Sequence, residues 1–208
     1  ARPAINMKYS KVIFVGDSRT VGMNATLNKQ MSSSVTSGVS FIASAGQGLS
    51  WFKSEGYSQL LKEINKTEGT LPIAVVFNLG VNDMANVSNY VSYMTGIAST
   101  LKSKNCKLFY MSVNPLNSTM IAKAGKGART EAQVREFNSK IHSGLSLNYK
   151  YIDTYNVLMK TGYGTNASYV GTDRDSDDGL HYTTRTYKRI YYYSVIYLNT
   201  GSINQIYY

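Results

Sequence analysis

Residues 11–20 read Lys-Val-Ile-Phe-Val-Gly-Asp-Ser-Arg-Thr, and this stretch decides how the rest of the chain is interpreted. Val12 to Val15 are apolar without alternation, which is typical of a strand buried on both faces in a parallel sheet. Gly16 permits a tight turn, and Asp17 or Ser18 can cap a helix that begins there. The pattern predicts a serine at the carboxyl end of a central strand, beside a helix amino terminus, where it can act as a nucleophile. The alternative is a plain turn followed by a capping serine.

Two later stretches carry related patterns. Residues 75–83 read Val-Val-Phe-Asn-Leu-Gly-Val-Asn-Asp, again an apolar strand followed by glycine and polar residues, and residues 178–181 read Asp-Gly-Leu-His. In this order the segments GDS, GxND and DxxH resemble the SGNH (GDSL-type) hydrolases, whose four conserved blocks supply Ser, Gly, Asn and His. The resemblance extends from Lys11 to about Tyr197, which is nearly the whole chain.

The resemblance implies an α/β fold, a three-layer α/β/α sandwich with a five-stranded parallel sheet. The apolar periodicity agrees, because strand and helix patterns alternate along the chain. We expect strands at residues 12–15, 39–43, 73–79, 106–113 and 149–153, and helices that include residues 57–65, 88–102, 131–145 and 183–197. With 208 residues and no linker or repeat, we expect a single domain over residues 1–208 with its core at about 11–197.

The resemblance also implies the catalytic residues. Ser18 is the expected nucleophile and His181 its base, while Asp178, three residues before His181, can hold the imidazole within a single turn. His142 is the only other histidine. We set it aside because no Asp-x-x-His precedes it and its helix lies far from the strand ends.

The expected oxyanion donors are the Ser18 amide, a glycine amide and the Asn82 side chain. Gly46 best matches the glycine of the second block, and Gly48 is the alternative. Both glycines could instead mark an ordinary loop. We interpret Asp83 as a structural residue that braces the loop after the third strand.

Two residues are candidates for substrate contact. Arg19 follows the nucleophile where the family name has leucine, so its cation could meet an acidic part of a substrate or point along the helix without a chemical role. A cation there favours short acyl groups, chiefly acetyl, on a polar carrier. Trp51 follows the glycine loop and could stack on a sugar ring or pack against the sheet.

Two loops leave alternatives open. Residues 114–130 form a long connection with Lys123, Lys126 and Arg129, which could be a wall or lid of the site or a solvated surface loop. The Asp173–Asp178 run lacks the terminal glutamate and the spacing of an EF-hand calcium loop. The mechanism that the resemblance implies requires no metal and no organic cofactor.

The net charge is +10, from 22 Lys and Arg against 12 Asp and Glu, and it favours anionic partners. We find no nucleic-acid motif and no dense basic run, so an anionic cell-wall polymer is the better candidate partner. No apolar run reaches the ~18 residues of a membrane span. The 18 Tyr and the charged fraction of 16% are associated with proteins outside the bacterial cell, which favours an extracellular or cell-envelope location.

Three functions follow as hypotheses. The first is a serine esterase that removes acetyl or other short acyl groups from a carbohydrate or cell-envelope glycan through an acyl-serine intermediate. The second is an O-acetyltransferase domain that passes the acyl group to a sugar hydroxyl of peptidoglycan or a polysaccharide. The third is a non-catalytic polymer-binding module, which the retained blocks disfavour.

Overall fold

The computed structural model describes residues 8–166 and 171–208. Its centre is a five-stranded, fully parallel sheet with the strand order β2-β1-β3-β4-β5. The strands are β1 (Lys11–Gly16), β2 (Val39–Ala43), β3 (Ile73–Asn78), β4 (Cys106–Met111) and β5 (Lys150–Ile152). The predicted fold class is confirmed.

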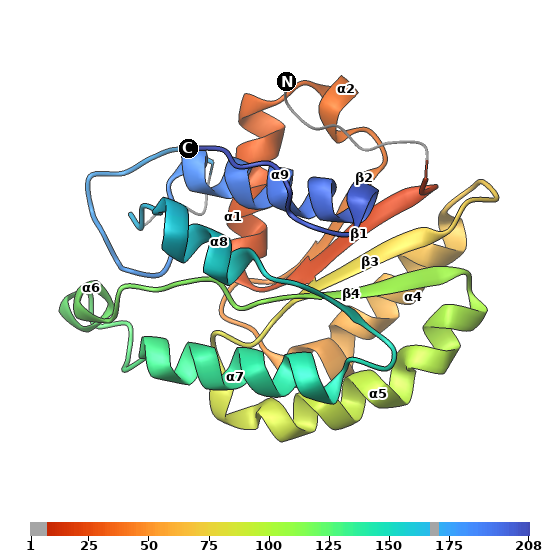
Figure 1. Ribbon diagram of the computed structural model, residues 1–208, viewed down its shortest axis with the longest axis horizontal. Helices are drawn as coiled ribbons and strands as arrows, with labels where there is room; N and C mark the ends of the chain where they lie inside the picture. Colours follow the sequence, from red (N-terminus) through yellow and green to blue (C-terminus); the bar gives the residue numbers. More distant parts are fainter. Residues whose placement is uncertain (1–7, 167–170) are drawn as a thin grey trace.

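Helices cover both faces of the sheet (Figure 1). The α-helices are α1 (Ser18–Gln30), α2 (Ser33–Thr36), α3 (Leu49–Trp51), α4 (Tyr57–Lys66), α5 (Val87–Ser103), α6 (Ser118–Lys123), α7 (Glu131–Gly144), α8 (Thr154–Thr161) and α9 (Thr184–Thr200). A π-helical turn, η1 (Phe52–Gly56), and a 3-10 turn, η2 (Met84–Asn86), complete the described elements. In Figure 1, α4, α5 and α7 lie below the sheet, whereas α1, α8 and α9 lie above it.

Alternate residues of β1 feed two separate apolar cores, which is why this strand reads as continuously apolar. Ile13 and Val15 belong to the core under α4, α5 and α7. Val12 and Phe14 belong to the core under α1, α8 and α9. All four side chains are fully or almost fully buried, so β1 is a central strand as predicted.

The turn from β1 into α1 is fixed by its own residues. A Cβ at Gly16 would overlap the Thr20 side chain and come within 2.9 Å of the Asn78 carbonyl oxygen, so only glycine fits there. Asp17 is the N-cap of α1, and its carboxylate accepts a hydrogen bond from the Arg19 amide at 3.0 Å. Ser18 is therefore the first residue of the helix.

α6 (Ser118–Lys123) and α8 (Thr154–Thr161) are not among the helices expected from the sequence. α6 occupies part of the connection at residues 114–130, and α8 begins directly after β5. Asp153 caps α8 by accepting from the Asn156 amide at 3.1 Å, and Gly162 ends it with φ +89°. In the described residues, no helix combines the length and apolarity needed to cross a membrane.

Candidate active site

The residues predicted to take part in catalysis lie at the carboxyl edge of the sheet. Ser18 follows β1 and Asn82 follows β3, and these two strands are neighbours in the sheet. The strand order reverses direction between them, which is where doubly wound sheets open a crevice for ligands. Asp178 and His181 reach the same edge from the segment before α9, because the His181 ring contacts the Ser18 side chain.

Three side chains form one hydrogen-bonded chain. The Oγ atom of Ser18 lies 2.7 Å from Nε2 of His181, and Nδ1 of His181 lies 2.6 Å from Oδ2 of Asp178. With Nδ1–H donating to the carboxylate, Nε2 faces the hydroxyl as an acceptor. All three residues are buried. This arrangement can deprotonate the Ser18 hydroxyl and hold the resulting charge on the imidazole next to a carboxylate.

The Asp178 carboxylate is held in its charged form. Burial alone would raise the pKa of Asp178, but hydrogen bonds from the His181 ring and from two backbone amides lower it well below its ordinary value. These amides belong to Leu180 and His181, and both donate to Oδ1 at 2.9 Å. One oxygen is thus occupied by the backbone, which leaves Oδ2 aimed at the imidazole.

A second buried carboxyl lies beside the nucleophile. Asp17 is almost fully buried, and burial raises its pKa to about 6, with the Arg19 amide and the Arg19 charge only partly opposing that rise. Its role in the described structure is to cap α1 and thereby fix the turn that carries Ser18.

The side chain of Asn82 is oriented by Arg129. Nη2 of Arg129 donates to Oδ1 of Asn82 at 3.1 Å, while Nδ2 of Asn82 donates to the Gln47 carbonyl at 2.8 Å. Arg129 itself is anchored by its Nε on the Val81 carbonyl at 3.0 Å. Because a guanidinium only donates, it fixes which end of the amide is the oxygen and leaves the second Nδ2 hydrogen for another acceptor. The sequence indicated this basic loop but not the contact.

The loop after β2 contains both glycines considered for the oxyanion site. Gly46 has φ +74° and lies in open space, whereas a Cβ at Gly48 would clash with the Asp83 carboxylate. Asp83 accepts from the Leu49 amide at 3.0 Å and from the Tyr90 hydroxyl at 2.5 Å. Asp83 therefore braces this loop, and Gly46 remains the glycine available to an approaching ligand.

No family model and no curated protein match this sequence. Solved structures do match its fold. A protein from Slackia heliotrinireducens described as an SGNH hydrolase aligns with a TM-score of 0.61 and 12% identity, over 91% of this chain and 97% of that one. An acetyl xylan esterase aligns with a TM-score of 0.59 and 15% identity, over 91% and 99%. The C-terminal catalytic domain of Streptococcus pneumoniae peptidoglycan O-acetyltransferase A aligns with a TM-score of 0.52 and 16% identity, over 91% and 92%.

This chain has the SGNH hydrolase fold. Within that fold, Arg19 is a departure from the GDSL pattern, and the structure corrects its predicted role. Arg19 is 5% exposed, and its guanidinium donates to three carbonyls, those of Leu180 at 2.8 Å, Asn114 at 2.7 Å and Pro115 at 2.9 Å. It also stacks over the Tyr182 ring at 4.7 Å. A guanidinium so occupied ties α1 to the segment that carries His181, and it does not face a substrate.

Of the two roles considered for Trp51, stacking on a sugar ring does not fit its position. Trp51 is 7% exposed and packs in the core under α4, with its ring 6.4 Å from that of Phe52. The packing alternative is therefore the correct one. His142 lies on the exposed side of α7, stacked on Tyr151 at 4.2 Å between ring centroids.

The aspartates before His181 accept hydrogen bonds from nearby backbone amides. Asp173 accepts from the Thr184 amide at 2.7 Å, and Asp177 accepts from the Gly179 amide at 2.8 Å and from the Thr165 hydroxyl at 2.9 Å. Among residues 8–166 and 171–208, no three His, Cys, Asp or Glu side chains are grouped as metal ligands. These carboxylates shape the loop that delivers the imidazole.

A cavity of about 290 Å³ adjoins Asn82. It is lined by residues 81–85 and 126–129 and by Gln133. Its walls are polar and basic on the side of the 114–130 connection, which therefore forms one wall beside the site. The cavity has room for a small group and no long apolar channel among its lining residues.

Proposed function

We propose that this protein is a serine esterase that removes acetyl or other short acyl groups from a carbohydrate or cell-envelope glycan. The observation that carries the proposal is the chain of two hydrogen bonds, 2.7 Å and 2.6 Å long, that joins Ser18, His181 and Asp178. The fold likeness to an acetyl xylan esterase supports ester chemistry on acetylated sugar. The bacterial cell exterior or envelope is the proposed location.

The first half of the proposed reaction forms an acyl-serine. His181 takes the proton from the Ser18 hydroxyl as Oγ attacks the ester carbonyl carbon. The carbonyl oxygen becomes negative and is stabilised by the amides of Ser18 and Gly46 and by Nδ2 of Asn82. The Ser18 amide lies in the first turn of α1, where helix amides have no acceptor within the helix. The C–O bond to the carrier then breaks, and the leaving alkoxide takes the proton from His181.

The second half releases the acyl group. His181 removes a proton from water, the water oxygen attacks the acyl carbon, and the same donors hold the second oxyanion. Collapse of this intermediate returns the proton to Ser18 and frees a carboxylic acid. The polar and basic lining of the cavity beside Asn82 supports a polar carrier. Arg19 does not contribute to this choice, because its guanidinium is buried.

The test compares the two histidines. Wild-type protein is expected to hydrolyse a small acetyl ester and to be labelled by a serine-directed phosphonate. Ser18→Ala and His181→Ala are each expected to lower turnover by about 10³-fold or more. His142→Ala is the matched control and should keep wild-type turnover. Activity that persists in Ser18→Ala would contradict the proposal.

An O-acetyltransferase is the second candidate, favoured by the fold likeness to the catalytic domain of peptidoglycan O-acetyltransferase A. Both functions share the acyl-serine and differ only in the acceptor that attacks it. Acetyl from an activated ester is followed in the presence of glycan acceptors. Free acetate with loss of glycan acetyl supports the esterase, whereas acetylated glycan supports the transferase.

A further inference from the structure

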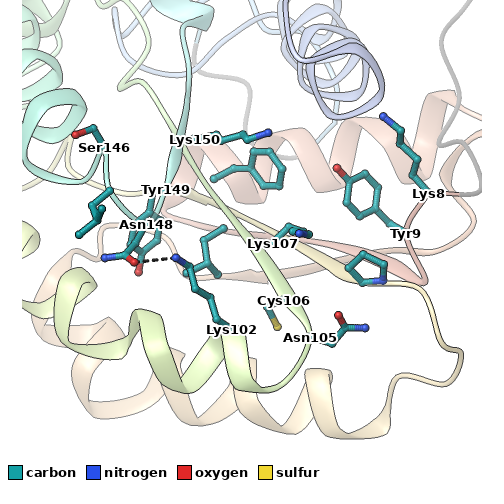
Figure 2. A pocket seen from close by; sticks show the side chains of 14 residues that line it. Lys8, Tyr9, Lys102, Asn105, Cys106, Lys107, Ser146, Asn148, Tyr149 and Lys150 are labelled. Carbon is teal, nitrogen blue, oxygen red and sulfur yellow. Dashed lines mark hydrogen bonds between the residues drawn. The ribbon is translucent and has the colours of Figure 1, made fainter.

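A lysine-lined cleft lies at the opposite edge of the sheet from Ser18. Figure 2 shows this cleft, which has a volume of about 750 Å³. Its lining residues come from the chain before β1, the start of β4 and the turns before β4 and β5. The six residues of β4 span about 20 Å. The cleft is therefore separate from the carboxyl edge that carries Ser18.

The cleft exists because β5 is shorter than its neighbour. β5 pairs only with the second half of β4, starting at Phe109 opposite Lys150. Residues 106–108 therefore extend beyond the end of β5, and the 146–149 turn passes beside them. The missing half of a strand leaves a hollow along the edge of the sheet.

The charged side chains that line the cleft are all positive. Among the described residues that line it there are four lysines, Lys8, Lys102, Lys107 and Lys150, and no carboxylate. In Figure 2, Lys107 lies between Lys102 and Tyr9, and Lys150 lies above it. Lys102 donates to the neutral amide oxygen of Asn148 at 2.8 Å. Lys107 and Lys150 are exposed, and their side-chain ammonium groups make no hydrogen bond or ion pair within the described chain.

The walls of the cleft also offer apolar and aromatic surface. Tyr9 is partly exposed among the lysines, and Leu147 is 89% exposed at the rim. Lysines that flank the Tyr9 ring and the Leu147 side chain suit a chain of saccharide rings that bears acidic groups, because a sugar ring packs on apolar surface while acidic groups meet ammonium groups.

We propose that this cleft binds an anionic glycan chain, one that carries carboxylate or phosphate groups along a saccharide backbone. The choice of an anion depends on the lysines alone. The choice of a glycan also rests on the proposed function, since a chain bound at this edge would be retained near the esterase that acts on it.

The test measures binding of the full chain to an oligogalacturonate of uniform length, with its methyl-esterified form as the uncharged probe of the same rings. Wild-type protein should bind the acidic form at low ionic strength and lose it as salt rises. Lys107→Gln combined with Lys150→Gln should weaken binding roughly tenfold, because two exposed charge pairs with the probe are lost.

The matched control removes two charges elsewhere. Lys62→Gln combined with Lys160→Gln changes exposed lysines on α4 and α8. This control should keep wild-type affinity to within about twofold, and both double variants should keep wild-type turnover of the small acetyl ester. Equal losses in the two double variants would mean that only net charge matters, which overturns the proposal.

Two more outcomes separate the alternatives. Equal binding of the methyl-esterified probe would overturn the charge-based site, and tighter, Lys107- and Lys150-dependent binding of single-stranded DNA would overturn the choice of a glycan. A protein that hydrolyses no acyl ester but keeps lysine-dependent oligogalacturonate binding would refute the proposed function and support the cleft.

Discussion

The direction in which the Asn82 amide points is controlled from another loop. Arg129 holds Oδ1 of Asn82, and the Gln47 carbonyl accepts one hydrogen of Nδ2. In the proposed mechanism the second Nδ2 hydrogen stabilises the oxyanion, so Arg129 acts as a positioning residue through Asn82. The same guanidinium contacts the Lys126 carbonyl at 2.7 Å, which couples the shape of its loop to the amide.

Arg129→Gln should therefore lower kcat about tenfold with little change in KM, since it loosens a donor used in the transition state. Asn82→Ala should lower kcat by about 10²- to 10³-fold. In the Asn82→Ala background, Arg129→Gln should add little. Lys123→Gln, which removes a charge from exposed α6, is the control. Additive effects in the double variant would exclude positioning through Asn82.

Asp17 makes a second prediction at this scale. Its pKa is about 6 in the folded protein, against 3.8 ordinarily, so the folded state holds its proton more tightly. Stability should therefore fall as pH rises between these two values, because a buried carboxylate becomes charged. Asp17→Asn keeps an N-cap of α1 without that charge.

The free energy of unfolding of Asp17→Asn relative to wild type should rise by about 1–3 kcal/mol between about pH 4 and about pH 7. Urea unfolding followed by circular dichroism at each pH measures this difference. A difference that does not change with pH would show that Asp17 titrates as an ordinary aspartate.

At the scale of the elements, the Glu63 carboxylate on α4 bonds to side chains of two strands. Glu63 contacts Lys11 of β1 at 2.8 Å, Ser40 of β2 at 2.7 Å and Lys66 at 2.9 Å. Burial alone would raise the pKa of Glu63, but the hydrogen bonds from Lys11, Lys66 and Ser40 lower it to about 2. A lowered carboxyl pKa stabilises the fold above about pH 4.5, and this contribution is lost as pH falls towards 2.

Glu63→Gln should reduce the free energy of unfolding by about 1–2 kcal/mol at neutral pH, an amount discounted because Lys66 is largely exposed. The difference from wild type should shrink as the pH approaches 2. Thermal unfolding of both proteins across this range measures it. Glu136→Gln, which breaks an exposed pair with Lys140 on α7, should have a much smaller effect.

The elements that the sequence predicted are those whose apolar period is strong. The strand at 39–43 was predicted to the residue, and the helices of residues 88–102 and 131–145 were placed to within one residue at each end. α8 was missed because its residues mix polar and β-branched types, although Asp153 before it and Gly162 after it were its cap signals. The burial of Arg19 could not be predicted, since it depends on distant segments that fold over it, whereas packing of Trp51 was one of the two roles that the sequence left open.

At the scale of the whole molecule, the proposed reaction acts on a neutral ester, whereas the protein carries a strongly basic net charge. The net charge is +10, and the four lysines of the cleft lie at the edge of the sheet opposite Ser18. If the cleft holds an anionic glycan, catalysis on such a polymer depends on salt, whereas catalysis on a small neutral ester does not.

Raising the ionic strength from low to physiological should accordingly increase KM for an acetylated anionic glycan severalfold and leave kcat/KM for a small acetyl ester unchanged. Initial rates on both substrates across a salt series measure the contrast. Parallel declines on the two substrates would instead indicate that salt acts on the site around Ser18.

Ser18 and His181 are separated by 163 positions along the chain, and their contact therefore forms only when the two ends of the fold have come together. During synthesis Ser18 emerges 163 residues before His181. The proposed enzyme is therefore inert until His181 has emerged and docked, and acyl transfer to Ser18 reports that this contact has formed. The time at which a serine-directed reagent begins to label Ser18 would thus measure when its contact with His181 forms.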